Sequence, residues 1–222
     1  MKLSVIIPTL NEAANLCGLL ERLADSPGIF EVVVADGGST DGTRDLCGTA
    51  TLVLSEPGRG MQLRAGASAA IGDVLLFLHA DVFPPRNLAT QISSALDTGF
   101  VGGNFRLKYP EGGFLGRWLE SLAPLYRRMG RYYGDSGIFV RRDVYDECGG
   151  FPHVPIMEDI IFIERMERAG HTAYLPGPME SSTRRFKGRA IRTLLLWGVM
   201  QLLFTLGVSP WRLAKLYRAH KR

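Results

Sequence analysis

The chain has 222 residues, of which 46% are hydrophobic, 22% charged and 9% aromatic. This length and composition predict one globular domain, with or without an appendage, and they exclude disordered and collagen-like chains. The three cysteines are too few and too scattered for a disulfide framework or a cysteine-based zinc site. They therefore indicate reduced thiols in a cytosolic protein.

The basic residues gather at the C-terminal end of the sequence. Ten of the 26 lysines and arginines lie within residues 181–222, and none of the 22 acidic residues does. The remaining residues therefore carry 16 basic against 22 acidic side chains, a net charge of −6, beside a tail of +10. Such asymmetry indicates that the tail meets a polyanion or an anionic membrane surface. The uncharged, mostly apolar stretch over residues 193–208 has 16 residues, fewer than the about 20 that cross a bilayer.

Strand-like and helix-like segments alternate over the first hundred residues. Apolar runs and helical periodicity predict strands over residues 3–9, 31–35, 51–55 and 74–78, and helices over 13–24, from 41–43 onward, 60–70 and 85–97. The alternation predicts an α/β fold, with a mostly parallel sheet and helices on both faces. No secretory signal precedes the first strand, so we expect a cytoplasmic protein.

The second half of the sequence is less regular. Its patterns predict strands over residues 102–107 and 137–141 and helices over 115–129 and after residue 158. We expect one domain over residues 1–180, followed by a basic amphipathic helical tail over residues 181–222.

Candidate site residues stand at or just beyond the ends of the predicted strands, where ligands bind in parallel sheets. They are Pro8, Thr9 and Glu12 at the first strand, Asp36 after the second, and His79 and Asp81 after the fourth. Asp81 is well placed to hold a hard cation with substrate phosphates, or it caps the next turn. Asp36 would accept hydrogen bonds from a nucleobase or a ribose, or it forms an Asx-turn. Asp41 is better explained as a helix cap.

Two further clusters carry charged residues. Arg59 and Arg64 flank a glycine-rich loop–helix junction that suits diphosphate binding. Leu63 stands where a dinucleotide fingerprint needs its third glycine, and the sequence has no P-loop motif, which disfavours both of those nucleotide-binding classes. Glu158 and Asp159 open a later helix, where paired acids are ordinary caps, or where Asp159 acts as a general base toward a substrate hydroxyl.

These blocks together resemble a known family. The segments at residues 5–12, 34–43, 72–81, 149–151 and 158–159 stand in the order and at the separations typical of family 2 glycosyltransferases. The resemblance covers about residues 1–170 and implies the GT-A fold, whose sheet is Rossmann-like. Residues 152–159, with Arg184, Arg185 and Phe186, further resemble a small bacterial subgroup, the radical-SAM/selenodomain-associated or arsenosugar-biosynthesis transferases.

The resemblance implies a UDP- or GDP-linked sugar donor and an acceptor that the sequence does not identify. It assigns nucleotide-binding positions to Pro8, Thr9, Glu12, Asp36, Arg59 and Arg64. It implies that Asp159 is the base of an inverting reaction, with Glu158 beside it as an orienting group. Asp81 matches the acid that contacts a divalent metal, Mn²⁺ or Mg²⁺.

Two positions depart from the family pattern. His79 replaces the first acid of the Asp-x-Asp motif, and Gly37 replaces the second acid of the usual Asp-Asp-Gly-Ser motif. An imidazole at position 79 would bond to ribose or favour Mn²⁺ over Mg²⁺ as a metal ligand.

Other functions remain as alternatives. A sugar nucleotidyltransferase would carry a glycine-rich loop with a lysine after the first strand, where this chain has residues 8–12. A non-catalytic nucleotide- or membrane-binding protein with a degenerate site is suggested by His79 and Gly37. Nucleic-acid binding is least favoured, because the acidic body would repel phosphate and no recognition motif is present.

The tail also has several interpretations. Residues 189–222 combine basic clusters, apolar runs and aromatic residues, which is typical of a helix lying in the plane of the inner membrane face. The same pattern fits a helix packed on the catalytic body or on a second subunit of a homodimer. Arg184 and Arg185 are alternatively placed to close over a donor diphosphate.

Overall fold

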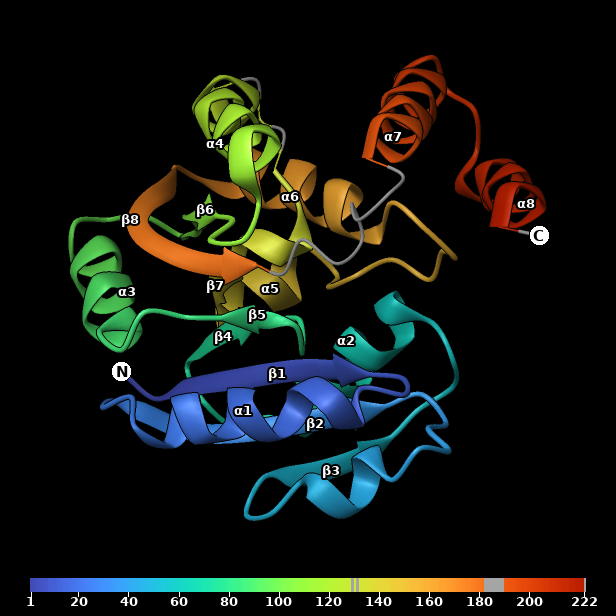
Figure 1. Cartoon of the computed structure of the whole chain (residues 1–222). Helices are drawn as coiled ribbons and strands as arrows, with labels where there is room; N and C mark the ends of the chain where they lie inside the picture. The colour runs from blue at the N-terminus through green and yellow to red at the C-terminus, as the bar shows by residue number, and fades with distance from the viewer. Residues whose placement is uncertain (129, 131, 182–189, 222) are drawn as a thin grey trace.

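The computed structural model describes residues 1–128, 130, 132–181 and 190–221 (Figure 1). Its sheet has the order β3-β2-β1-β4-β7-β6-β8-β5. The strands are β1 (Leu3–Thr9), β2 (Ile29–Asp36), β3 (Thr51–Leu54), β4 (Val74–Phe77), β5 (Val82–Phe83), β6 (Gly102–Lys108), β7 (Ile138–Arg141) and β8 (Thr172–Ser181). Strands β1 to β4 are mutually parallel, β7 lies antiparallel between β4 and β6, and β8 runs parallel to β6.

Helices cover both faces of this sheet, as the alternating pattern predicts. The longer helices are α1 (Ala13–Ala24), α2 (Arg59–Ala69), α3 (Leu88–Asp97), α4 (Gly113–Arg128), α6 (Glu158–Ala169), α7 (Ala190–Thr205) and α8 (Pro210–Lys221). Helices α1 and α3 pack on one face, and α2, α6 and the short α5 (Arg142–Glu147) pack on the other. The α/β prediction is confirmed.

Strand β1 divides its side chains between the two cores because successive residues of a strand point to opposite faces. Val5 and Ile7 pack in the core that α1 shares, whereas Ile6 packs in the core of α2 and α6. All three are fully buried. Each such aliphatic side chain contributes about 1.5–3 kcal/mol relative to exposure, so the central strand is firmly fixed where it carries the site.

The helix predicted from residues 41–43 onward is not an α-helix. Residues after Asp41 form only a short 3₁₀ turn, Thr43–Leu46, instead of a second helix. Gly48 then adopts a positive φ of 56°, and the chain turns directly into β3. The fourth helix also begins later than predicted, at Leu88.

The sequence analysis missed β8, which completes the sheet beside β6. Pro176, Gly177 and Pro178 lie inside this strand and read as strand breakers in the sequence. The structure accommodates them because the β6–β8 register shifts between Phe105 and Leu107.

The C-terminal tail contains two helices, α7 and α8, separated by a turn, where the sequence suggested one. Arg184, Arg185 and Phe186 lie outside the described residues, so the roles predicted for them stay predictions. Within the described part of the chain, none of the helices is long and apolar enough to cross a bilayer.

Candidate active site

The loops that follow β1 and β2 lie side by side at the carboxyl ends of these strands, and α2 packs against both strands (Figure 1). The side-chain amide of Gln62, on α2, donates hydrogen bonds to the carbonyl oxygens of Thr9 and of Ala35, the latter at 3.2 Å. The backbone N–H of Gly37 donates to the same Thr9 carbonyl at 2.9 Å. One buried glutamine therefore fixes the carboxyl ends of two neighbouring strands.

Asp36 is fully buried at the end of β2 and organises the loop that follows. Its carboxylate accepts hydrogen bonds from Thr9 Oγ1 at 3.2 Å and from the N–H groups of Gly38 and Ser39 at 3.0 and 2.9 Å. The Ser39 hydroxyl and Arg44 Nε, the latter at 2.7 Å, complete the set. Burial alone raises the pKa of Asp36, but the bonds from Ser39 and Arg44 outweigh it and lower the pKa to about 2.

We expect Asp36→Asn to destabilise the fold at pH 7 by about 2 kcal/mol, because the pKa difference from the unfolded chain is a stability term. A carboxyl with a lowered pKa stabilises the fold above its unfolded pKa of 3.8, and this contribution is lost as the pH falls toward 2. Urea unfolding at pH 7 and pH 3 measures the difference. The gap between wild type and variant should shrink at pH 3, and an unchanged gap would contradict the ionic origin of the effect.

Asp41 caps a helix, as its sequence position indicates, but it caps α1 from the neighbouring loop. Its Oδ2 accepts the N–H of Ala13 at 3.0 Å, and its Oδ1 accepts the N–H of Thr43 at 3.0 Å. The Thr43 hydroxyl in turn accepts the N–H of Glu12 at 2.9 Å. The loops after β1 and β2 are thus bonded to each other on the nucleotide side of the predicted site.

Glu158 and Asp159 open α6 and form a compact acidic pair with Arg59 of α2. Their exposed fractions are only 1% and 5%. Arg59 donates through Nε to Glu158 Oε1 and through Nη2 to Asp159 Oδ2, the latter at 3.4 Å. The N–H of Gly134 also donates to Asp159 Oδ2 at 3.1 Å, and the N–H of Ile160 donates to Oδ1 at 2.9 Å. The pair therefore does more than cap its own helix.

The charges in this cluster act on one another. Burial raises the pKa of Glu158, and the negative charge of Asp159 adds to that rise, whereas Arg59 opposes it. Burial alone would lower the pKa of Arg59, but Asp159, Glu158 and the nearby Asp135 raise it above its usual range. Arg59 is therefore a permanent cation between buried carboxylates.

His79 lies against the same pocket from the end of β4. A Cβ atom on Gly134 would stand 2.8 Å from His79 Nε2 and 3.7 Å from Asp159 Oδ2, so only glycine fits between the imidazole and the carboxylate. Asp81 is half-buried in the turn after β4, two residues beyond His79. Among the described residues, no three histidine, cysteine or acidic side chains converge as a ready-made metal cluster.

Arg64 is engaged with the protein itself. Its Nη1 donates to the carbonyl oxygens of Phe151 at 2.8 Å and Gly149 at 3.3 Å, which anchors the loop that leads to α6. Pro8 is half-buried, and Glu12 accepts a hydrogen bond from Asn15 at 2.5 Å. The predicted nucleotide roles of these residues stay predictions.

Sequence reasoning missed three residues that shape the site. Gln62 and Arg44 escaped notice because a glutamine within a helix and an arginine in a loop carry no distinctive signal. Asp135 stands in the segment Gly134–Ser136, immediately before β7. An acid in a glycine-flanked turn beside a buried strand is a signal that could have identified it.

The sheet order, with polar loops gathered at the carboxyl ends of β1, β2 and β4, defines the GT-A glycosyltransferase class of fold. A family model described as Glycosyl transferase family 2 matches residues 4–152. The chain belongs to glycosyl transferase family 2.

Two curated relatives illustrate the range of this family. Glycosyltransferase AglE of Haloferax volcanii is 29% identical over 189 residues, which cover 76% of this chain and 62% of that protein. Dolichol-phosphate mannosyltransferase of Pyrococcus furiosus is 29% identical over 168 residues, 68% of this chain and 45% of that protein. The chain therefore spans less than two thirds of the length of either relative.

Solved structures share the fold at lower identity. Glucosyl-3-phosphoglycerate synthase from Mycobacterium tuberculosis, in complex with Mn²⁺, UDP and glucosyl-3-phosphoglycerate, has a TM-score of 0.64 and 22% identity, over 94% of this chain and 81% of that chain. S. aureus TarS in complex with UDP-GlcNAc has a TM-score of 0.65 and 20% identity, over 83% and 59% of the two chains.

Proposed function

We propose that this protein is an inverting glycosyltransferase that moves a sugar from a nucleoside-diphosphate donor to an acceptor hydroxyl, with Asp159 as the general base. The observation that carries the proposal is the buried Asp159 carboxylate, held by Arg59 and Gly134 beside His79. UDP is the favoured nucleotide, because the glucosyl-3-phosphoglycerate synthase and TarS structures hold UDP or UDP-GlcNAc. GDP remains an alternative to be measured.

In the proposed reaction, Asp159 accepts the proton of the acceptor hydroxyl as that oxygen attacks the anomeric carbon from the face opposite the diphosphate. The bond from the anomeric carbon to the diphosphate oxygen breaks as the new glycosidic bond forms, which inverts the carbon. Gly134 and Ile160 fix the orientation of the carboxylate through its two oxygens. Glu158 positions the Arg59 guanidinium, whose charge is then available to the developing negative charge on the diphosphate.

On the donor side we assign the nucleoside to the loops after β1 and β2. Because five hydrogen-bond donors already satisfy Asp36, its contribution is to shape the loop so that the backbone of Gly37 and Gly38 lies against the ligand. Thr9 and Glu12 complete this side. Because Gly37 replaces the second acid of the family motif, more of the nucleoside recognition would fall to backbone groups of this loop.

A divalent cation fits the donor set at the end of β4. His79 offers an imidazole nitrogen and Asp81 a carboxylate, and Mn²⁺ accepts this mixture better than Mg²⁺ does. Diphosphate oxygens and water would complete the coordination. When bound, the cation would supply charge neutralisation at the leaving diphosphate.

The donor site is tested by calorimetric titration of the protein with UDP and GDP, with and without Mn²⁺. We expect one nucleotide to bind more tightly with Mn²⁺, and Asp81→Ala to abolish most of that metal-dependent gain. Asp97→Ala removes an exposed aspartate of α3 and should bind as the wild type does. No binding by the folded protein would overturn the donor assignment and favour the degenerate-site alternative. Nucleotidyl transfer would instead require a nucleoside triphosphate.

The remaining assignments are also proposals. We divide the chain into a catalytic domain over residues 1–180 and a tail over residues 181–222. We place the protein in the cytoplasm, with the basic tail against the inner face of the membrane. A homodimer is the competing use of the tail.

A further inference from the structure

Three helices on one side of the molecule expose an unusual amount of apolar surface. All three tryptophans of the chain lie on them: Trp118 on α4, Trp197 on α7 and Trp211 on α8, with exposed fractions of 47%, 38% and 56%. Tryptophan favours the boundary between a membrane and water, because its ring is apolar and its N–H is polar. The distribution is therefore not that of a buried core.

The exposed apolar residues form stripes along α4 and α7. On α4 the stripe is Phe114, Trp118 and Leu125, at spacings that place them on one helix face. On α7 the stripe is Leu195, Val199 and Leu202, and Leu206 continues it just after the helix ends at Thr205. We call the residues of these two stripes the apolar face.

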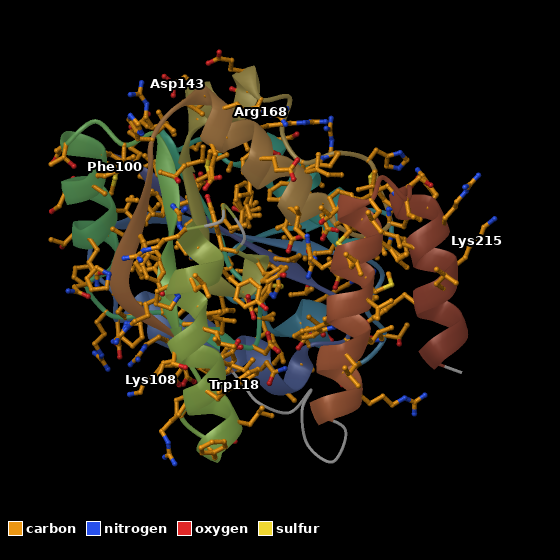
Figure 2. All side chains as sticks on the ribbon, turned by 90° about the horizontal axis from the view of Figure 1, so that it is seen from above. Phe100, Lys108, Trp118, Asp143, Arg168 and Lys215 are labelled. Atoms are coloured by element: carbon orange, nitrogen blue, oxygen red, sulfur yellow. The ribbon has the colours of Figure 1, made fainter. Side chains whose placement is uncertain are left out.

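The two stripes meet in one hollow. An open cavity of about 570 Å³ lies between α4 and α7, and its lining is almost wholly apolar. Its walls are Phe114, Leu115, Trp118, Leu195, Gly198, Val199 and Leu202. Figure 2 shows α4, α7 and α8 on the side turned to the viewer, with Trp118 on α4 and Lys215 on α8. The catalytic body, through α4, therefore shares this surface with the tail.

The same three helices also carry exposed basic side chains. Arg117 on α4, Arg192 on α7, and Arg212 and Lys215 on α8 are exposed. Helices α7 and α8 contain no acidic residue. On α4 the single acid, Glu120, accepts the N–H of Tyr109 at 2.6 Å, so it is engaged with the protein. The surface is therefore both apolar and positively charged.

We propose that α4, α7 and α8 form one membrane-binding face that inserts into an anionic phospholipid bilayer. The charge favours this occupant over a second copy of the chain, because two copies would bring two basic tails together. It also favours anionic over neutral lipid, since basic side chains are attracted to the negative charge of an anionic bilayer surface. The proposal extends beyond the tail, because α4 belongs to the catalytic domain.

Vesicle sedimentation with the full chain tests the proposal directly. We expect binding to phosphatidylcholine vesicles that contain phosphatidylglycerol, weak binding to pure phosphatidylcholine, and loss of binding at high salt. Phospholipids brominated on their acyl chains should quench the fluorescence of Trp118, because this tryptophan lies on the apolar face. Failure of the folded protein to bind either vesicle would overturn the proposal.

Variants of the face separate insertion from charge alone. Phe114→Asp and Leu202→Asp together should reduce vesicle partitioning at least tenfold, whereas Leu54→Asp, an exposed leucine on the edge strand β3, should not. Equal loss in the Leu54 control would contradict the assigned face. A dimer that the same double variant dissociates, without vesicle binding in the wild type, would also overturn it. UDP titration of the variants reports on the donor site independently, so the two proposals stand or fall separately.

Discussion

Asp159→Asn should lower kcat about 10²–10⁴-fold, the usual contribution of a general base. The amide keeps the shape of the carboxylate and one acceptor oxygen for Gly134, but it cannot take the acceptor's proton. Because we assign the nucleoside to the loops after β1 and β2, UDP affinity should change little. The loss then lies in turnover and not in KM.

The measurement combines UDP release from a UDP-sugar, in the presence of acceptor, with UDP calorimetry. Asp143→Asn is the matched control, because Asp143 is an exposed aspartate paired with Arg141 at 2.5 Å outside the pocket. The control should retain full activity. Full activity in Asp159→Asn would remove this residue from the role of base, and equal loss of UDP binding would assign it to the donor site.

Arg59→Ala should destabilise the protein by about 3 kcal/mol, because it leaves two buried carboxylates without their shared cation. This figure is at the lower end for buried ion pairs, since the arginine side chain is 38% exposed. Urea unfolding measures the change. Arg86→Ala breaks an exposed pair with Asp25 and should cost less than about 1 kcal/mol, because solvent screens both partners.

The Arg59 effect should also depend on pH. Burial raises the pKa of Glu158 above its ordinary value of 4.5, so the native state binds the proton more tightly than the unfolded chain. Stability from this group is therefore lost as the pH rises above 4.5. Without Arg59 the pKa of Glu158 rises further, and the variant should lose more stability at pH 8 than at pH 5. Glu158→Gln in the same background should remove that dependence.

Strong local patterns account for what could be predicted of the fold. Strand β1 and helix α1 have the predicted bounds, because an apolar run ending in Thr9 and a leucine repeat in Ala13–Ala24 are unambiguous. Strand β8 could not be predicted, since its prolines conflict with local propensity and the strand depends on distant partners, namely β6, β5 and Gln91 of α3. The helix predicted after Asp41 was wrong for the opposite reason, because its local signal was strong. Asp41 is a good helix cap, but in the folded chain it caps α1.

The sequence singled out Asp36, Arg59 and Asp159 as candidate site residues, and those roles stay predictions. Nothing local to each residue shows which partner it takes in the folded chain. Arg59 and Asp159 are a hundred residues apart in the chain, and their contact depends on how α2 and α6 pack. Gln62 and Arg44 were missed for the same reason, because their importance comes from the hydrogen bonds that they make in the folded chain.

The hydrogen bonds between the loops after β1 and β2 mean that the proposed donor side of the site is already ordered before a ligand binds, whereas the proposed acceptor side is not. Asp41, Thr43 and Asp36 hold the donor half in shape without any ligand, so a nucleotide meets a preorganised surface and little conformational entropy is lost on binding. The acceptor half differs, because Arg59 is already paired with both acids. A diphosphate that draws this guanidinium toward itself would loosen its hold on Asp159. In the proposed reaction, arrival of the donor would thereby free the Asp159 carboxylate to take the acceptor's proton, so we expect the donor to bind before the acceptor.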